Sequence, residues 1–250
     1  MNKILEIKDL GLIYQTKDKE LEAIKNISFS VNSGEFIGIV GPSGCGKSTL
    51  LSLIAGLIKP SKGEIILSEG AHSTGYMLQK DYLFPWRTIW ENVLLGLEIK
   101  KAKTKENIEK VVRLLKTYGL YEFRNAYPDE LSGGMRQRSA LIRTLATDPD
   151  ILLLDEAFSA LDYQTRLAVA DDIYSIIKKE NKTVLMVTHD ISECVSLADR
   201  VIVLSTRPAV IKSEYKIDFG NEVLTPLQKR DRPEFSQYFN KIWGDIDIHV

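Results

Sequence analysis

The glycine-rich segment at residues 41–48 constrains the fold of this chain more than any other feature of its sequence. It reads Gly-Pro-Ser-Gly-Cys-Gly-Lys-Ser, which fits the pattern G-x-x-x-x-G-K-[ST]. Apolar residues 36–40 precede it and a helical pattern at 48–57 follows it, so we expect a strand, a loop and a helix in that order. Glycines let backbone N–H groups turn toward phosphate oxygens, and the helix N-terminus adds partial positive charge. The segment therefore predicts a phosphate-binding loop in an α/β protein.

Two side chains of this loop can act directly on a nucleoside triphosphate. The Lys47 ammonium can reach the β- and γ-phosphates, and the Ser48 hydroxyl can bind Mg²⁺. Cys45 is interpreted as a small loop residue rather than a nucleophile. A chance glycine turn is the alternative, and the flanking strand and helix argue against it. The expected nucleotide-binding residues of the loop are Gly41, Pro42, Ser43, Gly44, Cys45, Gly46, Lys47, Ser48 and Thr49.

A second segment ends a buried strand with two acids. Residues 151–156 read Ile-Leu-Leu-Leu-Asp-Glu, so Asp155 stands at the carboxyl end of the strand, where it can hold Mg²⁺ through water. Glu156 can then polarise an attacking water molecule. Taken alone, a strand that ends in acids at a solvated edge is an equally good explanation. The phosphate-binding loop makes the catalytic interpretation the better one.

The rest of the pattern predicts an α/β chain with a helical insertion. The first thirty residues alternate between apolar and polar types, which predicts two or three antiparallel strands. Short apolar runs then alternate with helical stretches, as in a parallel sheet covered on both faces. The expected fold class is α/β, a P-loop NTPase core with a mostly parallel sheet, an N-terminal antiparallel β subdomain and an inserted α-helical subdomain. Later strands are expected at 63–67, 74–78, 151–154, 183–188 and 200–204, and helices at 105–118, 133–146, 162–178 and 190–198.

Composition excludes several classes of protein. The 33 Lys and Arg residues balance 34 Asp and Glu residues, so there is no bulk basic signal for nucleic-acid binding. The two cysteines, Cys45 and Cys194, have no partner at metal-ligand spacing and fit a reducing compartment. No apolar run approaches the ~18 residues that span a bilayer, so we expect the chain not to cross a membrane by itself.

A third motif decides among the possible families. Residues 131–134 read Leu-Ser-Gly-Gly and open a helix with Met-Arg-Gln-Arg, about twenty residues before the acidic strand. A helix start of this kind is a second anion-binding site, although Ser132 can also be a simple helix N-cap. With this motif in that place, residues 1 to about 210 resemble the ATP-binding subunits of ABC transporters. The resemblance implies an ATPase that uses ATP and Mg²⁺, in a cassette at 1–215 with its helical subdomain at about 83–146.

The resemblance also implies roles for residues outside the loop. Tyr14 stands where the family stacks an aromatic ring on adenine, although it could be an ordinary strand aromatic. Gln79 matches a glutamine that senses Mg²⁺ and the partner protein, and His189 matches a switch histidine that contacts the γ-phosphate. Ser132, Gly133 and Gly134 of the signature are expected to act on the nucleotide of a partner copy. Asp162 is expected to act there too, because it ends the Ser159–Asp162 loop that crosses the dimer interface. The metal-site residues are Ser48, Gln79 and Asp155, and the catalytic residues are Glu156 and His189. His72 and His249 have no such context and are interpreted as structural.

The segment after Gln79 indicates a branch of the family. Pro85-Trp86 resembles importers of the nitrate, sulfonate and taurine type. This implies a homodimer under two membrane permease subunits, at the cytoplasmic face of the membrane and served indirectly by an extracytoplasmic solute-binding protein, with no nucleic acid as partner. The apolar cluster expected to receive a permease helix is Tyr82, Leu83, Phe84, Trp86 and Trp90.

Three other functions stay open at this point. An exporter or lipoprotein-release ATPase shares every nucleotide-binding motif. A non-transport ABC ATPase usually carries two cassettes or a long coiled coil, whereas this chain has one phosphate-binding loop and no heptad run. A small-molecule kinase would not need the Leu-Ser-Gly-Gly signature. The tail at 216–250 is polar, and a last helix is expected at 233–243.

Overall fold

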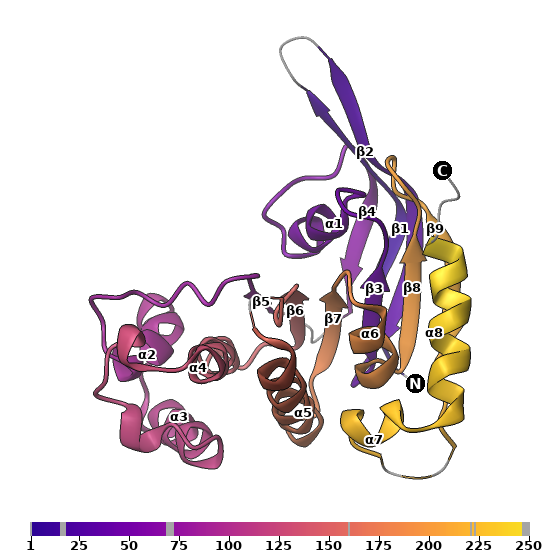
Figure 1. The fold of residues 1–250 in the computed structure, drawn as a ribbon. Helices are drawn as coiled ribbons and strands as arrows, with labels where there is room; N and C mark the ends of the chain where they lie inside the picture. The colour runs from indigo at the N-terminus through magenta and orange to yellow at the C-terminus, as the bar shows by residue number, and fades with distance from the viewer. Residues whose placement is uncertain are drawn as a thin grey trace.

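The computed structural model describes residues 2–15, 19–68, 73–159, 161–220, 222 and 224–246. His72, Ala160 and His249 lie outside the described residues. Two β-sheets and a set of covering helices make up the fold, with a cluster of helices set to one side (Figure 1). None of the helices in these ranges is both long enough and apolar enough to span a bilayer.

The larger sheet has six strands in the order β5-β6-β7-β3-β8-β9. All of them run parallel except β9, which pairs antiparallel with β8. The parallel strands β3, β7 and β6 are neighbours, so the segments that follow them leave from the same edge of the sheet. The bounds are β3 Phe36–Val40, β5 Thr74–Met77, β6 Ile151–Asp155, β7 Thr183–Val187, β8 Arg200–Leu204 and β9 Ile211–Lys216.

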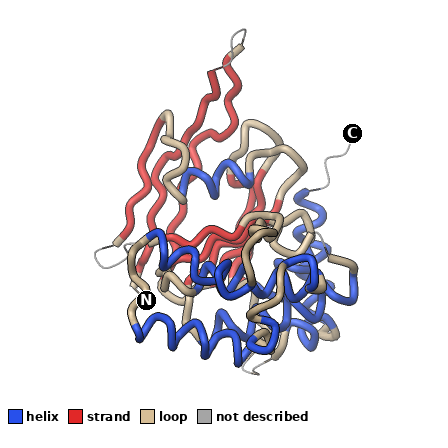
Figure 2. The backbone as a smooth tube through the Cα atoms, turned by 90° about the vertical axis from the view of Figure 1, so that its left-hand side faces the viewer, coloured by secondary structure: helices blue, strands red, loops and turns tan. Residues whose placement is uncertain are grey.

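The smaller sheet is antiparallel and lies over one face of the larger one (Figure 2). Its strand order is β2-β1-β4, with β1 Lys3–Gln15, β2 Glu20–Asn32 and β4 Lys62–Leu67. Helix α1, Lys47–Ile54, packs with this sheet against the parallel strands. The predicted mixture of a parallel core and an antiparallel N-terminal sheet is confirmed.

Each parallel strand is apolar on both faces because both faces are covered. In β6, Ile151 and Leu153 pack toward α1 and the antiparallel sheet, whereas Leu152 and Leu154 pack toward the helices of the opposite face. Those helices are α5, Tyr163–Lys179, and α6, Ile191–Leu197. This is why the sequence shows continuous apolar runs there rather than alternation.

The inserted region is a bundle of helices that stands apart from the antiparallel sheet (Figure 1). It contains α2 Ile89–Ile99, α3 Lys105–Thr117 and α4 Gly133–Leu145, with 3₁₀ turns at Tyr121–Phe123 and Pro128–Glu130. The Thr88 side chain caps α2 through a reciprocal capping box with Glu91, and Thr104 caps α3. These caps fix the start of each helix, and α2 and α4 pack closely on each other.

The C-terminal segment packs on the core. Beyond β9, a short helix α7, Pro226–Arg230, precedes α8, Pro233–Ile246, which is longer than the helix expected at 233–243. Helix α8 runs alongside α6, β8 and β9 (Figure 1), and its Ile242 is fully buried. Neither β9 nor α7 was expected from the sequence.

Candidate nucleotide-binding site

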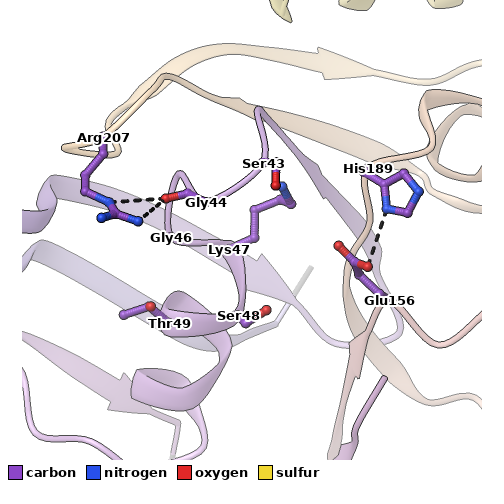
Figure 3. Close-up of a pocket in the computed structure, with 9 residues that line it drawn as sticks. All are labelled: Ser43, Gly44, Gly46, Lys47, Ser48, Thr49, Glu156, His189 and Arg207. Carbon is purple, nitrogen blue, oxygen red and sulfur yellow. Dashed lines mark hydrogen bonds and ion pairs between the residues drawn. The ribbon is translucent and has the colours of Figure 1, made fainter. Parts of the chain in front are cut away.

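An open cavity of about 480 Å³ lies at the sheet edge where β3, β6 and β7 end (Figure 3). The phosphate-binding loop and the first turn of α1 form one wall, and the residues that follow β6 and β7 form the opposite wall. Its lining residues are Ser43, Gly44, Gly46, Lys47, Ser48, Thr49, Glu156, His189 and Arg207. The cavity thus combines backbone N–H donors at a helix start with an acid, an imidazole and two cations.

The loop has the backbone geometry that its glycines predict. Gly44 and Gly46 have φ angles of 71° and 124°, a region that other L-residues rarely adopt. The Lys47 side chain is buried, and its Nζ donates hydrogen bonds to the carbonyl oxygens of Gly41 at 2.8 Å and Pro42 at 3.0 Å. The ammonium therefore lies along the loop, at the base of the cavity.

The Asp155 carboxylate has two hydroxyl partners from different elements. The Ser48 hydroxyl donates to Oδ1 at 2.8 Å, and the Tyr76 hydroxyl, from β5, donates to Oδ2 at 3.0 Å. Burial, assisted by the Asp155 charge, raises the pKa of Tyr76 to about 12, so this phenol stays a donor. Hydroxyl and carboxylate oxygens suit Mg²⁺, which completes its coordination with water and phosphate oxygens. The described residues contain no cluster of three or more His, Cys, Asp or Glu side chains that could hold a metal alone.

The Glu156 side chain, on the second wall of the cavity, contacts two other polar residues. Its φ is +45°, a left-handed conformation that interrupts strand alternation directly after Asp155. The Gln79 amide donates to Glu156 Oε2 at 3.0 Å and to the Ser159 hydroxyl at 3.3 Å, while His189 Nδ1 lies 3.4 Å from Glu156 Oε2. Glu156 therefore contacts both Gln79 and His189, although the three residues come from different segments of the chain. Gln79 bonds to Glu156 and not to the Ser48–Asp155 pair.

The Leu-Ser-Gly-Gly signature lies elsewhere. The Ser132 hydroxyl accepts a hydrogen bond from the Met135 N–H at 3.3 Å and so caps α4. A Cβ on Gly133 would lie 3.2 Å from Leu161, in the loop before α5, and one on Gly134 would lie 3.0 Å from Val169 of α5, so these glycines allow close packing with that loop and helix. In the described part of the chain, neither the signature nor Asp162 lines the cavity. Helix α4 and the loop before it belong to the helical bundle, away from α1 (Figure 1).

Comparison with known proteins decides the family. The profile of the ABC transporter family matches residues 24–159, more than half of the chain. The chain belongs to the ABC transporter ATP-binding family. It is therefore an ATPase with the α/β fold of ABC cassettes.

Relatives and solved cassettes extend this match over nearly the whole chain. The ABC transporter ATP-binding protein YtlC of Bacillus subtilis is 44% identical over 94% of this chain and 92% of its own. The nitrate import ATP-binding protein NrtD of Synechocystis is 42% identical over 95% of this chain and 93% of its own. The ATP-binding cassette MJ0796, solved as a dimer bound to ADP and Pi, superimposes with a TM-score of 0.73 at 31% identity, over 87% of this chain and all of that one.

Two import proteins for organic sulfonates also match. The aliphatic sulfonates import ATP-binding protein SsuB of Bacillus cereus is 37% identical over 92% of this chain and 95% of its own. The taurine import ATP-binding protein TauB of Roseobacter denitrificans is 36% identical over 96% of this chain and 94% of its own. The expected resemblance to the nitrate, sulfonate and taurine branch is confirmed.

Two further residues of this ABC cassette have structural surroundings that bear on their expected roles. The Tyr14 hydroxyl lies 3.5 Å from Thr49 Oγ1, so the ring stands beside the first turn of α1. Cys45 is buried in the loop, and burial raises the pKa of its thiol, which keeps it protonated and unreactive.

A polar network behind His189, with Thr188 and Glu193 buried at its centre, was not expected from the sequence. The Thr188 hydroxyl donates to the buried Glu193 carboxylate at 2.7 Å, and burial raises the pKa of Glu193. Arg166 Nη2 donates to the Leu161 carbonyl at 3.0 Å, and Nη1 lies 3.6 Å from the Asp190 carboxylate. The network ties the loop before α5 to the loop that carries His189. The Thr-His-Asp run after β7 was the available signal, but its partner Arg166 is visible only in three dimensions.

Proposed function

We propose that this chain is the ATPase subunit of an importer for a small solute of the nitrate, sulfonate or taurine kind. It works as a homodimer beneath two permease subunits, at the cytoplasmic face of the membrane. An extracytoplasmic solute-binding protein delivers the cargo to the permease. The observation that carries the proposal is the 36–42% identity to nitrate, sulfonate and taurine import ATP-binding proteins over more than nine-tenths of the chain.

Within one copy, the roles follow from the lining of the cavity. Lys47 and the backbone N–H groups of the cavity-lining residues Ser43, Gly44 and 46–49 bind the β- and γ-phosphates. Ser48, Asp155 and the side-chain carbonyl of Gln79 would hold Mg²⁺, which would neutralise charge on the phosphates, while the Gln79 amide nitrogen donates to Glu156. Glu156 accepts a hydrogen bond from the attacking water and orients it for attack on the γ-phosphorus. The Gln79 and His189 contacts at 3.0 and 3.4 Å support this role, because they hold the carboxylate at the cavity wall.

A second copy completes the site. The residues Ser132, Gly133, Gly134 and Asp162 of that copy face the γ-phosphate across a dimer interface. Their position outside the cavity of their own chain supports this arrangement. So does the likeness to MJ0796, whose cassette has been solved as a dimer.

The permease docks on the segment between β5 and α2. The Tyr82 and Trp86 side chains are 57% and 71% exposed, and Trp86 lies against Phe84 with ring centroids 5.0 Å apart. Large exposed aromatic groups of this kind are typical of partner sites. Leu83, which was expected in this cluster, is instead buried in the core. Trp90 is partly buried and packs against the same core. Because Gln79 begins this segment and bonds to Glu156, a permease helix that moves the segment also moves the catalytic acid.

Reconstituted transport tests this function. The chain is assembled in proteoliposomes with the permease and binding protein of its own gene neighbourhood, and ATP-dependent uptake of nitrate, taurine and an alkanesulfonate is measured. Uptake of one of them is expected. Trp86→Glu should abolish uptake and leave the ATPase activity of the isolated chain unchanged, whereas Trp243→Glu, at a comparably exposed tryptophan on α8, should leave both unchanged.

The competing functions give different results in the same assay. ATP-dependent transport of lipid or solute across the membrane, away from its cytoplasmic side, would identify an exporter. ATPase activity with no permease association would indicate a non-transport ATPase. Either result contradicts the importer assignment while leaving the ATPase itself intact.

A further inference from the structure

Arg207 lines the nucleotide cavity although it belongs to no motif of the phosphate-binding loop. It lies in the turn between β8 and β9, and its Nε and Nη2 donate to the Gly44 carbonyl oxygen at 3.2 and 2.5 Å (Figure 3). Over the described ranges of the chain, no carboxylate forms an ion pair with this guanidinium. The cavity therefore holds a second cation beside Lys47, and its charge is available to an anion.

The turn that carries Arg207 is firmly held. The Ser205 hydroxyl accepts a hydrogen bond from the Val210 N–H at 3.1 Å and donates to the Pro208 carbonyl at 3.2 Å. Ala209 is buried and exchanges backbone hydrogen bonds with Ala23 and Lys25 of β2, at 3.0 and 2.9 Å. The turn thus joins the two sheets, and Arg207 stands at the cavity on a fixed backbone.

The position of Arg207 along the cavity defines which part of a nucleotide it can reach. Glu156 and His189 lie at one end, and Arg207 lies at the other, on the side of Thr49 (Figure 3). The proposed roles of Glu156 and His189 put the γ-phosphate at their end. The adenosine end therefore points toward Arg207, and the 3.5 Å contact between the Tyr14 hydroxyl and Thr49 places the adenine-stacking candidate on this same side.

We infer that Arg207 is a nucleotide-binding residue whose guanidinium pairs with the α-phosphate. This inference rests on the proposed nucleotide site. A guanidinium has five N–H donors in a planar fork, so Nε can stay on the Gly44 carbonyl while other N–H groups donate to a phosphate oxygen. Charge-assisted bonds from arginine to phosphate are short and strong, and a neutral carbonyl does not satisfy the positive charge. The Gly44 contact then orients the guanidinium, and the α-phosphate accepts hydrogen bonds from its remaining N–H groups.

An α-phosphate contact predicts a specific pattern of binding. MgATP and MgADP both carry the α-phosphate, so Arg207→Gln should weaken both by the same factor, about tenfold for the loss of one charge-assisted bond. Arg207→Lys keeps the charge and loses the fork, so its loss should be smaller and again equal for the two nucleotides. Arg113→Gln, an exposed arginine change on α3, should bind both nucleotides as the wild type does.

Calorimetric titration of the full chain with MgATP, MgADP and the two α-phosphorothioate diastereomers of ATP tests the inference. Replacing the non-bridging oxygen that faces Arg207 with sulfur weakens the contact, and only one diastereomer carries sulfur at that position. Arg207→Gln should therefore reduce the affinity ratio that the wild type shows between the two diastereomers. A merely structural role would not change that ratio. The unfolding midpoint of the nucleotide-free variant should equal that of the wild type, and Arg207→Lys serves if the glutamine variant does not fold.

Three results would overturn the inference. Weakening of MgATP binding alone would move the contact to the γ-phosphate. Unchanged affinities, or an unchanged diastereomer ratio, would show that Arg207 does not contact the phosphates. In each case the wild type and Arg113→Gln still bind nucleotide, so the proposed function stands. Failure of those two chains to bind any nucleotide would instead refute the nucleotide site and this inference together.

Discussion

The chain has two loop-to-helix junctions suited to bind phosphate, and their surroundings differ. Helix α1 begins after Gly46, which has no side chain to cap it, and its first turn opens on a cavity that also holds Glu156 and His189. Helix α4 begins after Ser132, whose hydroxyl already caps it, and no acid or histidine of the described cavity stands beside it. The first junction therefore has an acid and an imidazole beside its helix start, and the second has only the helix start. In the proposed dimer, a single chain supplies half of each catalytic site.

The largest expected effect concerns the acid that distinguishes the first junction. Glu156→Gln should lower ATP turnover by about 10²–10⁴-fold, the usual contribution of a positioned general base. Affinity for MgATP should persist, because Lys47 and the loop are untouched. Turnover, ATP affinity and sedimentation are measured on the same preparation, and the variant should collect as an ATP-bound dimer.

Asp155→Asn is the matched control for that change. It removes the carboxylate that accepts hydrogen bonds from Ser48 and Tyr76, so it should raise the Mg²⁺ concentration needed for activity as well as lowering turnover. Near wild-type turnover in Glu156→Gln, or a monomer at saturating MgATP, would show that Glu156 does not distinguish the two junctions in this way.

An intermediate effect is expected at the base-binding side of the first junction. Tyr14→Ala should weaken ATP binding by about 1–3 kcal/mol, the typical contribution of stacking between a base and an aromatic ring. Binding of inorganic tripolyphosphate should change very little, because it has no base. The two ligands are titrated in parallel, and an equal loss for both would make Tyr14 a structural residue of β1 that supports α1 through Thr49.

The smallest effect is expected at the second junction. Ser132→Ala removes the N-cap of α4 and should lower the free energy of unfolding by about 0.5–2 kcal/mol. No comparable cap exists at Gly46, so the two helix starts differ in how their first N–H groups are satisfied. Chemical denaturation measures the change. An unfolding free energy equal to that of the wild type would mean that Ser132 does not stabilise α4.

Local motifs predicted most residues of the first junction. The residues that they did not predict reach the site through contacts between segments far apart in the sequence. The glycines, Lys47 and the acids that end β6 are recognisable because each motif fixes its own backbone or follows a strand directly. The contact of Tyr76 with Asp155 depends on the register of β5 against β6, which no local pattern reveals. Arg207 reaches Gly44 only because Ala209 ties its turn to β2.

Helix ends and exposed faces were predicted less well. The helix expected at 48–57 ends at Ile54, and Gly56 just beyond it adopts a left-handed φ of 72°, a conformation that ends many helices. Leu83 belongs to the apolar cluster that the sequence predicts as a permease contact, yet its side chain is buried in the core. The tail at 216–250 is polar overall, but one apolar face of α8 covers α6, and a polar average conceals that face.

A mixing experiment tests most directly the claim that the site is shared between copies. Lys47→Ala chains lack a working phosphate-binding loop and keep the signature, whereas Ser132→Arg chains keep the loop and lose the signature. Each should be inactive alone, and Ser132→Arg should still bind ATP nearly as the wild type does. Mixed dimers contain one intact composite site, so an equimolar mixture should hydrolyse ATP well above either variant alone. A mixture that forms mixed dimers and stays as inactive as its components, or a Ser132→Arg chain that hydrolyses ATP by itself, would contradict the account.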